Sequence, residues 1–325
     1  MKKCIQKQLL SIIPGVAAMI FSALVAGQPY PTKPVRIIVA FAPGGGNDLV
    51  ARVVAQLLSE RLKQSFIVEN RVGASGIIGT EFVAKSAPDG YTMLMGSQTT
   101  QAVVPAMYKV SYDTGKDFTG VLEVTRSPML LVVHPSLPVK SAADLIKLAK
   151  ARPGQLSYGA ASGGTPHMAG ELFRLMAGIE FLFVPYKGEG PAVADAMGGQ
   201  ISMVFSNLPV VLPHARSGRL RGIAVTSQQR VPTAQEYPTV AESGLPGYDA
   251  FTWNGLFVPS ATPRDVVAKI QSETAAALTN ADAKEKLASQ GLFVVASTTE
   301  QFAEFVKKEI PRWAKVVKDA GVKPQ

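Results

Sequence analysis

The amino-acid sequence predicts an α/β protein with two lobes, each a mostly parallel sheet flanked by helices, and a cleft between the lobes. The first observation behind this prediction is that strand-like and helical patterns alternate along the chain after residue 35. The second is that the chain twice passes from an apolar run through a Gly-rich turn into a helix, over residues 35–58 and 156–176. A chain of 325 residues, 47% of them hydrophobic, is long enough for two lobes.

The predicted strands are short runs rich in Val, Ile and Phe, and several are continuously apolar, as buried parallel strands are. They cover residues 35–41, 65–71, 91–97, 129–135, 156–161, 181–186, 201–206, 221–226 and 255–260. Helical periodicity fills the intervals between them. It predicts helices over residues 48–63, 76–86, 142–151, 166–177, 191–198, 209–217, 263–287 (in one piece or two) and 299–320.

Two segments connect the predicted lobes. Residues 117–126 separate the two strand–turn–helix units, and residues 227–238 follow the last strand of the second unit. If both segments are crossovers, the first lobe consists of residues 28–125 plus 230–325, and the second lobe of residues 126–229. A simple division near Met129 is the alternative.

Residues 1–27 have the order of a cleavable secretory signal peptide. Three lysines in the first seven residues precede an apolar run over residues 9–25, and small residues follow at Ala26 and Gly27. A membrane anchor is the alternative, but the run is short for a bilayer span and is interrupted by Pro14. We therefore expect export with cleavage near Ala26 or Gly27.

The number of cysteines and the net charge limit which cellular compartment and which kinds of partner we expect. Cys4 is the only cysteine and lies in the leader, so the mature chain would hold no disulfide, thiol nucleophile or Cys-bound metal. Export without disulfides favours a bacterial periplasm. The formal charge of +9 falls to +6 without the three leader lysines, which indicates either a solvated basic surface or a bias toward anionic small molecules. The chain has no dense basic run with interleaved aromatic residues, so we expect no nucleic acid partner.

The Gly-rich turns match no nucleotide or hydrolase motif. In the first turn Leu49 stands where a dinucleotide fingerprint needs its third Gly, and no Gly-Lys-Ser/Thr sequence occurs. A G-x-S-x-G motif is also absent, and no pair of histidines or carboxylates has metal-ligand spacing. The sequence therefore predicts no cofactor and no metal, and it favours binding over catalysis.

The turns themselves are candidate anion sites, because a Gly-rich turn before a helix presents unpaired N–H groups and the positive end of the helix dipole. In the second turn we expect Thr165 as N-cap and Pro166 at the first helical position, which would leave the N–H groups of residues 162–164 available. In the first turn Asp48 has three open roles: orienting the loop, meeting a ligand ammonium, or capping its helix.

Further candidates follow from position. Ligands in open α/β sheets bind beyond the carboxyl ends of the strands, and the polar residues that end strands there are Ser97, Thr99, Lys187 and Asn207. Three aromatic residues near the turns, Phe41, Tyr158 and Trp253, would cover a planar ligand or pack in the core.

The three histidines divide by position along the chain. His167 lies at a helix start beside the predicted cleft, where a ligand or loop-ordering role competes with a plain surface position. His134 and His214 adjoin prolines at element ends, and we expect both to be structural.

At these residues the chain resembles the Bug-type periplasmic solute-binding proteins of tripartite tricarboxylate transporters. The resemblance runs through nearly the whole mature chain and includes APGGGND, NRVGASGIIG, YGAASGGTPHMAGELF, VPYKGEGPAV and FSNLP. It implies a Venus-flytrap fold, no enzymatic activity, and a monomer that delivers a small carboxylate to a membrane permease. Carried onto matching positions, it nominates as ligand contacts Phe41, Ala42, Gly44, Gly45, Asp48, Ser162, Gly163, Thr165, His167 and Asn207.

One departure from the family bears on the ligand. Many members have an Asp before the Asn of the F-x-N-L-P motif, where this chain has Ser206. If that side chain points inward, the loss of a negative charge near the cleft favours a more anionic ligand, such as a dicarboxylate, over a cationic or amide one. An outward side chain would make the difference silent. Aliphatic dicarboxylates, tricarboxylates, aromatic carboxylates and acidic amino acids all stay open.

Two other functions would use the same cleft: an exported α/β enzyme acting on a small carboxylate, and a ligand sensor for a membrane receptor. The missing cysteine, triad motif and metal cluster weigh against the enzyme. The sequence does not separate transport from sensing.

Overall fold

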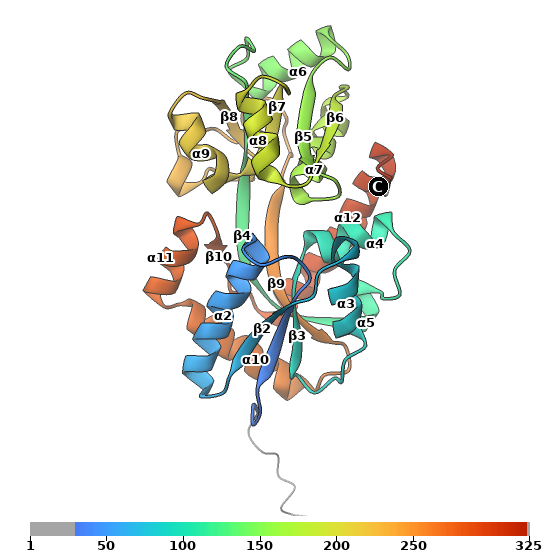
Figure 1. Ribbon diagram of the computed structural model, residues 1–325, viewed down its shortest axis with the longest axis vertical. Helices are drawn as coiled ribbons and strands as arrows, with labels where there is room; N and C mark the ends of the chain where they lie inside the picture. Colours follow the sequence, from blue (N-terminus) through green and yellow to red (C-terminus); the bar gives the residue numbers. More distant parts are fainter. Residues whose placement is uncertain (1–29, 324–325) are drawn as a thin grey trace, which may run out of the picture.

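A computed structural model describes residues 30–323, so the expected signal peptide over residues 1–27 lies outside the described residues. The protein has two lobes joined by two long strands, β4 (Phe118–Val133) and β9 (Phe251–Pro259). These strands run antiparallel to each other, with Phe118 opposite Pro259 and Pro128 opposite Phe251. Figure 1 shows them crossing from the lower lobe to the upper one.

The first lobe, the lower one in Figure 1, is built on the parallel strand order β2-β1-β3. Its strands are β1 (Val35–Val39), β2 (Phe66–Asn70), β3 (Thr92–Ser97) and the short β10 (Phe293–Val294). Its helices include α2 (Gly46–Leu62), α3 (Ile77–Ala84), α10 (Arg264–Leu278) and α11 (Ala281–Ser289). A core cluster that includes Ile37, Leu58, Met93 and Leu256 joins the sheet to α2 and α10.

The second lobe has the parallel strand order β7-β5-β6. Its strands are β5 (Ser157–Ala161), β6 (Leu182–Tyr186), β7 (Met203–Asn207) and β8 (Arg221–Val225). Its helices are α6 (Ala142–Ala151), α7 (Thr165–Ala177), α8 (Glu189–Met197) and α9 (Leu208–Arg216). Its core combines aliphatic residues with several buried aromatic ones, among them Tyr158 and Phe173.

The predicted α/β class and two-lobed fold are confirmed, but the sheets are more mixed than the expected mostly parallel ones. Strand β4 pairs antiparallel with β7, β8, β9 and β10, and β9 pairs antiparallel with β3. The cause is topological. The chain crosses between the lobes once in each direction, so the crossing strands oppose each other and their sheet neighbours.

The two strands that cross between the lobes are longer than the strands predicted from the sequence. Residues 118–126, which the sequence pattern indicated as a connection, are the beginning of β4, and β9 begins at Phe251, before the strand predicted over residues 255–260. Three short helices lie between β3 and β4, where no element was predicted: η3 (Thr99–Val103), α4 (Val104–Met107) and α5 (Thr114–Asp117).

The C-terminal helix α12 (Thr299–Ala320) braces the two lobes. A capping box formed by Thr298 and Gln301 starts this helix. Phe302 near its start belongs to a cluster with β9 and α3, whereas Trp313 near its end belongs to the core cluster of the second lobe. None of the helices within residues 30–323 has the length and apolar character that crossing a membrane requires.

Candidate ligand-binding cleft

The first Gly-rich turn, Pro43–Gly46, is held by Asp48. Gly44 adopts a left-handed backbone with φ of 87°, and its N–H donates to Oδ2 of Asp48 at 3.0 Å. The same oxygen accepts from Arg52 Nε at 2.8 Å, and Oδ1 accepts from Asn70 Nδ2 at 2.9 Å. Of the three roles open to Asp48, these contacts support loop orientation.

The electrostatics of Asp48 agree with that role. The residue is 3% exposed, and burial alone would raise its pKa. The hydrogen bonds from Arg52, Gly44 and Asn70 outweigh burial and lower the pKa of Asp48 to about 2. Asp48 is therefore ionised at neutral pH, and its charge is paired with Arg52.

The second turn, Ser162–Thr165, is likewise held by a hydrogen bond from a glycine N–H to a side chain four residues later. Gly163 has φ of 71°, and its N–H donates to Nδ1 of His167 at 3.0 Å. Gly164, not Thr165, is the N-cap of α7, so Thr165 takes the first helical position and Pro166 the second. The expected availability of the turn's N–H groups is wrong for Gly163 and Gly164, because the latter donates to Ala161 O at 3.0 Å.

The helix starts still offer donors. An α-helix leaves the N–H groups of its first residues without a helical partner. In α2 the first helical bond runs from Leu49 N–H to Gly45 O, and in α7 it runs from Met168 N–H to Gly164 O. The N–H groups of Gly46, Asn47 and Thr165 lie ahead of these bonds. The two helices thus present amide donors from opposite lobes.

His167 lies behind its turn as a buried, neutral residue. Its side chain is 4% exposed and stacks on Phe183, with ring centroids 3.8 Å apart and an angle of 8° between the planes. Burial lowers the pKa of His167 to about 4. Since Nδ1 accepts from Gly163, these contacts support a loop-ordering role.

Both turns border one cavity between the lobes, which we call the first chamber, with a volume of about 230 Å³. Its lining includes seven of the residues indicated by the sequence: Phe41, Gly45, Asp48, Ser97, Thr99, Thr165 and Asn207. An adjoining cavity of about 380 Å³, the second chamber, shares six lining residues with the first: Gly45, Gly46, Asn47, Glu189, Asn207 and Thr252. Gly44 lines this second chamber.

The remaining candidates line neither chamber. Ala42, Ser162, Gly163, His167 and Lys187 lie outside both linings. Tyr158 and Trp253 are fully buried in the core, so neither side chain covers a ligand in this structure.

Sequence reasoning missed Glu189, which borders both chambers as the first residue of α8. Its carboxylate accepts from Ser206 Oγ at 2.5 Å, from the Asn207 N–H at 3.0 Å and from Asn207 Nδ2. Ser206 lines neither chamber, and through Glu189 a negative charge still borders the cleft beside it. The sequence placed the PYKGEGP loop at the end of a strand, where ligand contacts are expected, but this position favoured Lys187 as much as Glu189.

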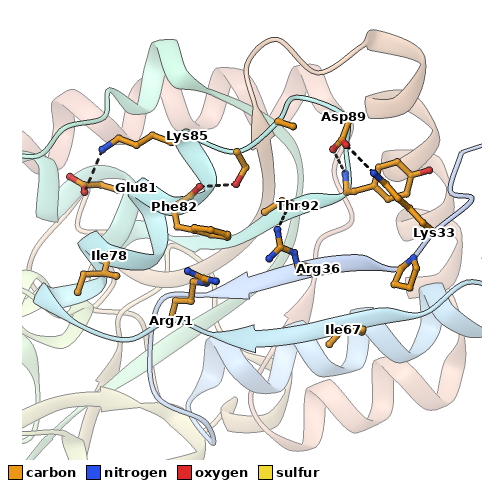
Figure 2. Close-up of a pocket in the computed structure, with 14 residues that line it drawn as sticks. Lys33, Arg36, Ile67, Arg71, Ile78, Glu81, Phe82, Lys85, Asp89 and Thr92 are labelled. Atoms are coloured by element: carbon orange, nitrogen blue, oxygen red, sulfur yellow. Dashed lines mark hydrogen bonds and ion pairs between the residues drawn. The ribbon is translucent and has the colours of Figure 1, made fainter.

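A further cavity of about 830 Å³ lies away from the turns on the first lobe. Figure 2 shows Lys33 directed at Asp89 and Lys85 at Glu81 along its margin. Each of its four cations has an acidic partner: Lys33 with Asp89, Lys85 with Glu81, and both Arg36 and Arg71 with Glu69. This internal pairing makes the cavity a weaker candidate for an anionic ligand.

Among residues 30–323, no group of three or more His, Cys, Asp or Glu side chains is arranged to hold a metal ion.

Two lobes joined by crossing strands, with helix starts facing one cavity, define the class of two-lobed solute-binding proteins. Residues 50–322 match the family model described as the tripartite tricarboxylate transporter family receptor. The chain belongs to this family.

Known relatives are similar to this chain over nearly its full length. Protein BugT of Bordetella pertussis is 38% identical over 311 residues, which cover 95% of each chain. A solved R. palustris protein, described with adipate, is 39% identical with a TM-score of 0.79 and covers 91% of this chain and all of its own. MatC from Rhodopseudomonas palustris, described with bound malate, is 30% identical with a TM-score of 0.75, over 89% of this chain and all of its own.

Proposed function

We propose that this protein is a periplasmic receptor that captures a small carboxylate by closure of its two lobes and delivers it to a tripartite transporter permease. The observation that carries the proposal is the first chamber, which the starts of α2 and α7 border from opposite lobes. Backbone N–H groups at helix starts favour an anion without any cationic side chain. The adipate and malate described for two relatives are ligands of this chemical class.

The ligand carboxylate would accept hydrogen bonds from the amides of Asn47 and Thr165, with the hydroxyls of Ser97 and Thr99 beside them. In this account Asp48 and His167 hold the two turns in the geometry that the ligand needs. Ala42, Ser162 and Gly163 shape the turns. Binding favours the closed state because only that state brings both helix starts to one carboxylate.

The moving parts follow from the connections. We propose that residues 28–125 plus 230–325 form one lobe and residues 126–229 the other, with β4 and β9 as the hinge. The helix α12 would rest against both lobes during closure, since its two ends pack into different clusters. We further propose that the protein is an exported monomer, matured by cleavage near Ala26 or Gly27.

A role as an enzyme finds little support in the cleft. His167 is the histidine nearest to the turns, and its Nδ1 is occupied by the Gly163 N–H. A sensor for a membrane receptor would use the same cleft. Deletion of the gene separates these functions: a transport receptor predicts loss of carboxylate uptake, whereas a sensor predicts loss of a transcriptional response with uptake intact.

Isothermal titration tests the binding step. The mature protein is titrated with succinate, adipate, malate, citrate, benzoate and L-glutamate. Saturable 1:1 binding of at least one of these, together with a smaller radius of gyration in solution scattering, would support the proposal. No binding to any of them and no change in scattering would contradict it.

A further inference from the structure

The charge of the cleft is the starting point. Among the described residues that line the two chambers, the charged ones are Asp48 and Glu189, and both are acidic. Asp48 is ion-paired with Arg52 at 2.8 Å. The charge of Glu189 therefore decides which ligand groups can lie near it.

Glu189 accepts its three hydrogen bonds from neutral donors, the hydroxyl of Ser206 and the two N–H groups of Asn207. Within residues 30–323 no Lys, Arg or His nitrogen lies within 4 Å of its carboxylate. Lys187, two residues earlier, is exposed and lines neither chamber. The Glu189 carboxylate is thus fixed in position, partly exposed to the cleft, and without a cationic partner.

A second polar residue borders the same chamber. Asn254 on β9 is 1% exposed, and its Nδ2 donates to Thr125 Oγ1 at 3.2 Å. Its Oδ1 is buried and has no hydrogen-bond partner within the described part of the chain. A buried polar atom without a partner is uncommon in a folded protein, and it indicates a donor that arrives with a ligand or with water. Asn254 and Glu189 both line the second chamber.

The two chambers of the cleft therefore present different polar groups to a ligand. The first chamber offers amide donors from helix starts, which suit a carboxylate. The second chamber offers the uncompensated carboxylate of Glu189, which suits a group with several N–H donors and a positive charge, and the unpartnered oxygen of Asn254 lies buried in its wall. A second ligand carboxylate there would lie near a like charge in a partly desolvated site, which is unfavourable.

We propose that Glu189 recognises an ammonium group, so that the preferred ligands are amino acids rather than the dicarboxylates of the same carbon skeleton. The inference rests on the proposed function, because it assumes that a ligand carboxylate is held by the two turns. It makes Glu189 a specificity-determining residue for that ligand.

The test compares two ligands that differ in the ammonium group alone, L-glutamate and glutarate, by isothermal titration at pH 7. The wild type should bind L-glutamate at least tenfold more tightly than glutarate. Glu189→Gln retains the size of the side chain and an acceptor for Asn207, and it should abolish or reverse that preference.

Two control variants isolate the charge. Glu180→Gln, at an exposed carboxylate on the same lobe, should retain the wild-type preference. Ser206→Ala removes one hydrogen bond to Glu189 but leaves its charge, so it should also retain the preference. If Glu189→Gln fails to fold, a wild type that binds glutarate as tightly as L-glutamate or more tightly still overturns the proposal.

The contradicting outcomes are distinct. If the wild type binds glutarate as tightly as L-glutamate or more tightly, or if Glu189→Gln keeps the preference, the assignment of Glu189 is overturned while the proposed receptor function stands. If the wild type binds neither these two ligands nor any other small carboxylate, the receptor function itself fails.

Discussion

Gly163 donates its backbone N–H to Nδ1 of His167 across 3.0 Å, so a buried imidazole holds the Gly-rich turn of the second lobe. The first lobe repeats this arrangement, with Gly44 donating to Asp48 across the same distance. In each turn a left-handed glycine is tied to the side chain four residues later. The two turns are thus held by the protein itself, which would lower the entropy lost in the ligand binding that we propose for them.

The His167 bond should matter for both stability and affinity. His167→Leu leaves the Gly163 N–H without its acceptor and should lower the free energy of unfolding by about 1–3 kcal/mol. It should also weaken carboxylate binding at least tenfold, because the turn loses its geometry. His167→Asn can restore an acceptor near the position of Nδ1 and should recover part of both losses.

Chemical denaturation and isothermal titration of these two variants measure the effects. His134→Leu is the control, since His134 bonds to Ser136 at the surface and lies away from the cleft. Equal losses for His167→Leu and His134→Leu would contradict the role of His167.

The protonation of His167 predicts a pH dependence. Its pKa of about 4 in the folded state lies below the ordinary value of 6.5, because the site is buried. Between these values the unfolded chain binds more protons, so the His167 contribution to stability is complete above pH 6.5 and is lost as the pH falls toward 4. Lowering the pH from 7 to 4.5 should cost about 2–3 kcal/mol through this residue.

The measurement is the difference between wild type and His167→Asn in the free energy of unfolding from pH 7 to 4.5. This difference is needed because Glu123 and Asp249 titrate with the opposite sign, since burial raises the pKa of each. Asp48, with its pKa near 2, stays ionised throughout this range. Parallel stability curves for the two proteins would argue against a neutral buried His167.

Gly45 allows a direct test of the first turn. Its backbone has φ of −78°, and a Cβ would meet only the carbonyl oxygen of Ala42 at 3.8 Å. Gly45→Leu should therefore fold normally but project a side chain into the chamber, reducing carboxylate affinity at least 100-fold by isothermal titration. Gly115→Leu, at another glycine without positive φ, should leave binding unchanged.

A substitution at Gly163 tests ligand binding less cleanly than a substitution at Gly45, because it also affects stability. Its φ is positive, and a Cβ at this position would meet the Met107 sulfur at 3.2 Å. Any side chain there is therefore strained, at a cost of about 1–2 kcal/mol for the backbone alone. Gly163→Leu should lower both stability and binding. A Gly45→Leu protein that binds like wild type would show that the first turn does not face the ligand.

The junction of the lobes depends on Glu309 of α12. Its Oε2 accepts from the indole N–H groups of Trp253 at 3.1 Å and Trp313 at 2.7 Å, and all three residues are buried. Glu309→Leu leaves two buried donors without an acceptor and should cost about 2–5 kcal/mol of unfolding free energy. Glu304→Leu, on the exposed face of the same helix, should cost little, and an equal cost for both would contradict the role of Glu309.

Much of the fold was predictable because the strands and helices have strong patterns. The helix predicted over residues 299–320 agrees with the structure, and of the two alternatives for residues 263–287 the structure shows the division into two helices. The lengths of β4 and β9 were not predictable from pattern, because the sequence over 118–126 holds Thr, Gly and Glu among its apolar residues. Pairing of β4 with β9, not local preference, makes these segments strands.

The candidate site was predictable where chemistry follows from local sequence. Both Gly-rich turns and the strand-end residues Ser97, Thr99 and Asn207 border the chamber. Glu189 and Asn254 were not recognised, because their importance comes from what surrounds them: an absence of cations for the first and an unpartnered oxygen for the second. Such properties arise only when the lobes are assembled.

The structure of the protein in complex with a ligand from the titration panel, L-glutamate by preference, tests the central claim most directly. We predict one ligand carboxylate between the lobes, with its oxygens within about 3.2 Å of amide nitrogens at the starts of both α2 and α7. A ligand held by one turn alone, or bound outside the two chambers, would contradict the account.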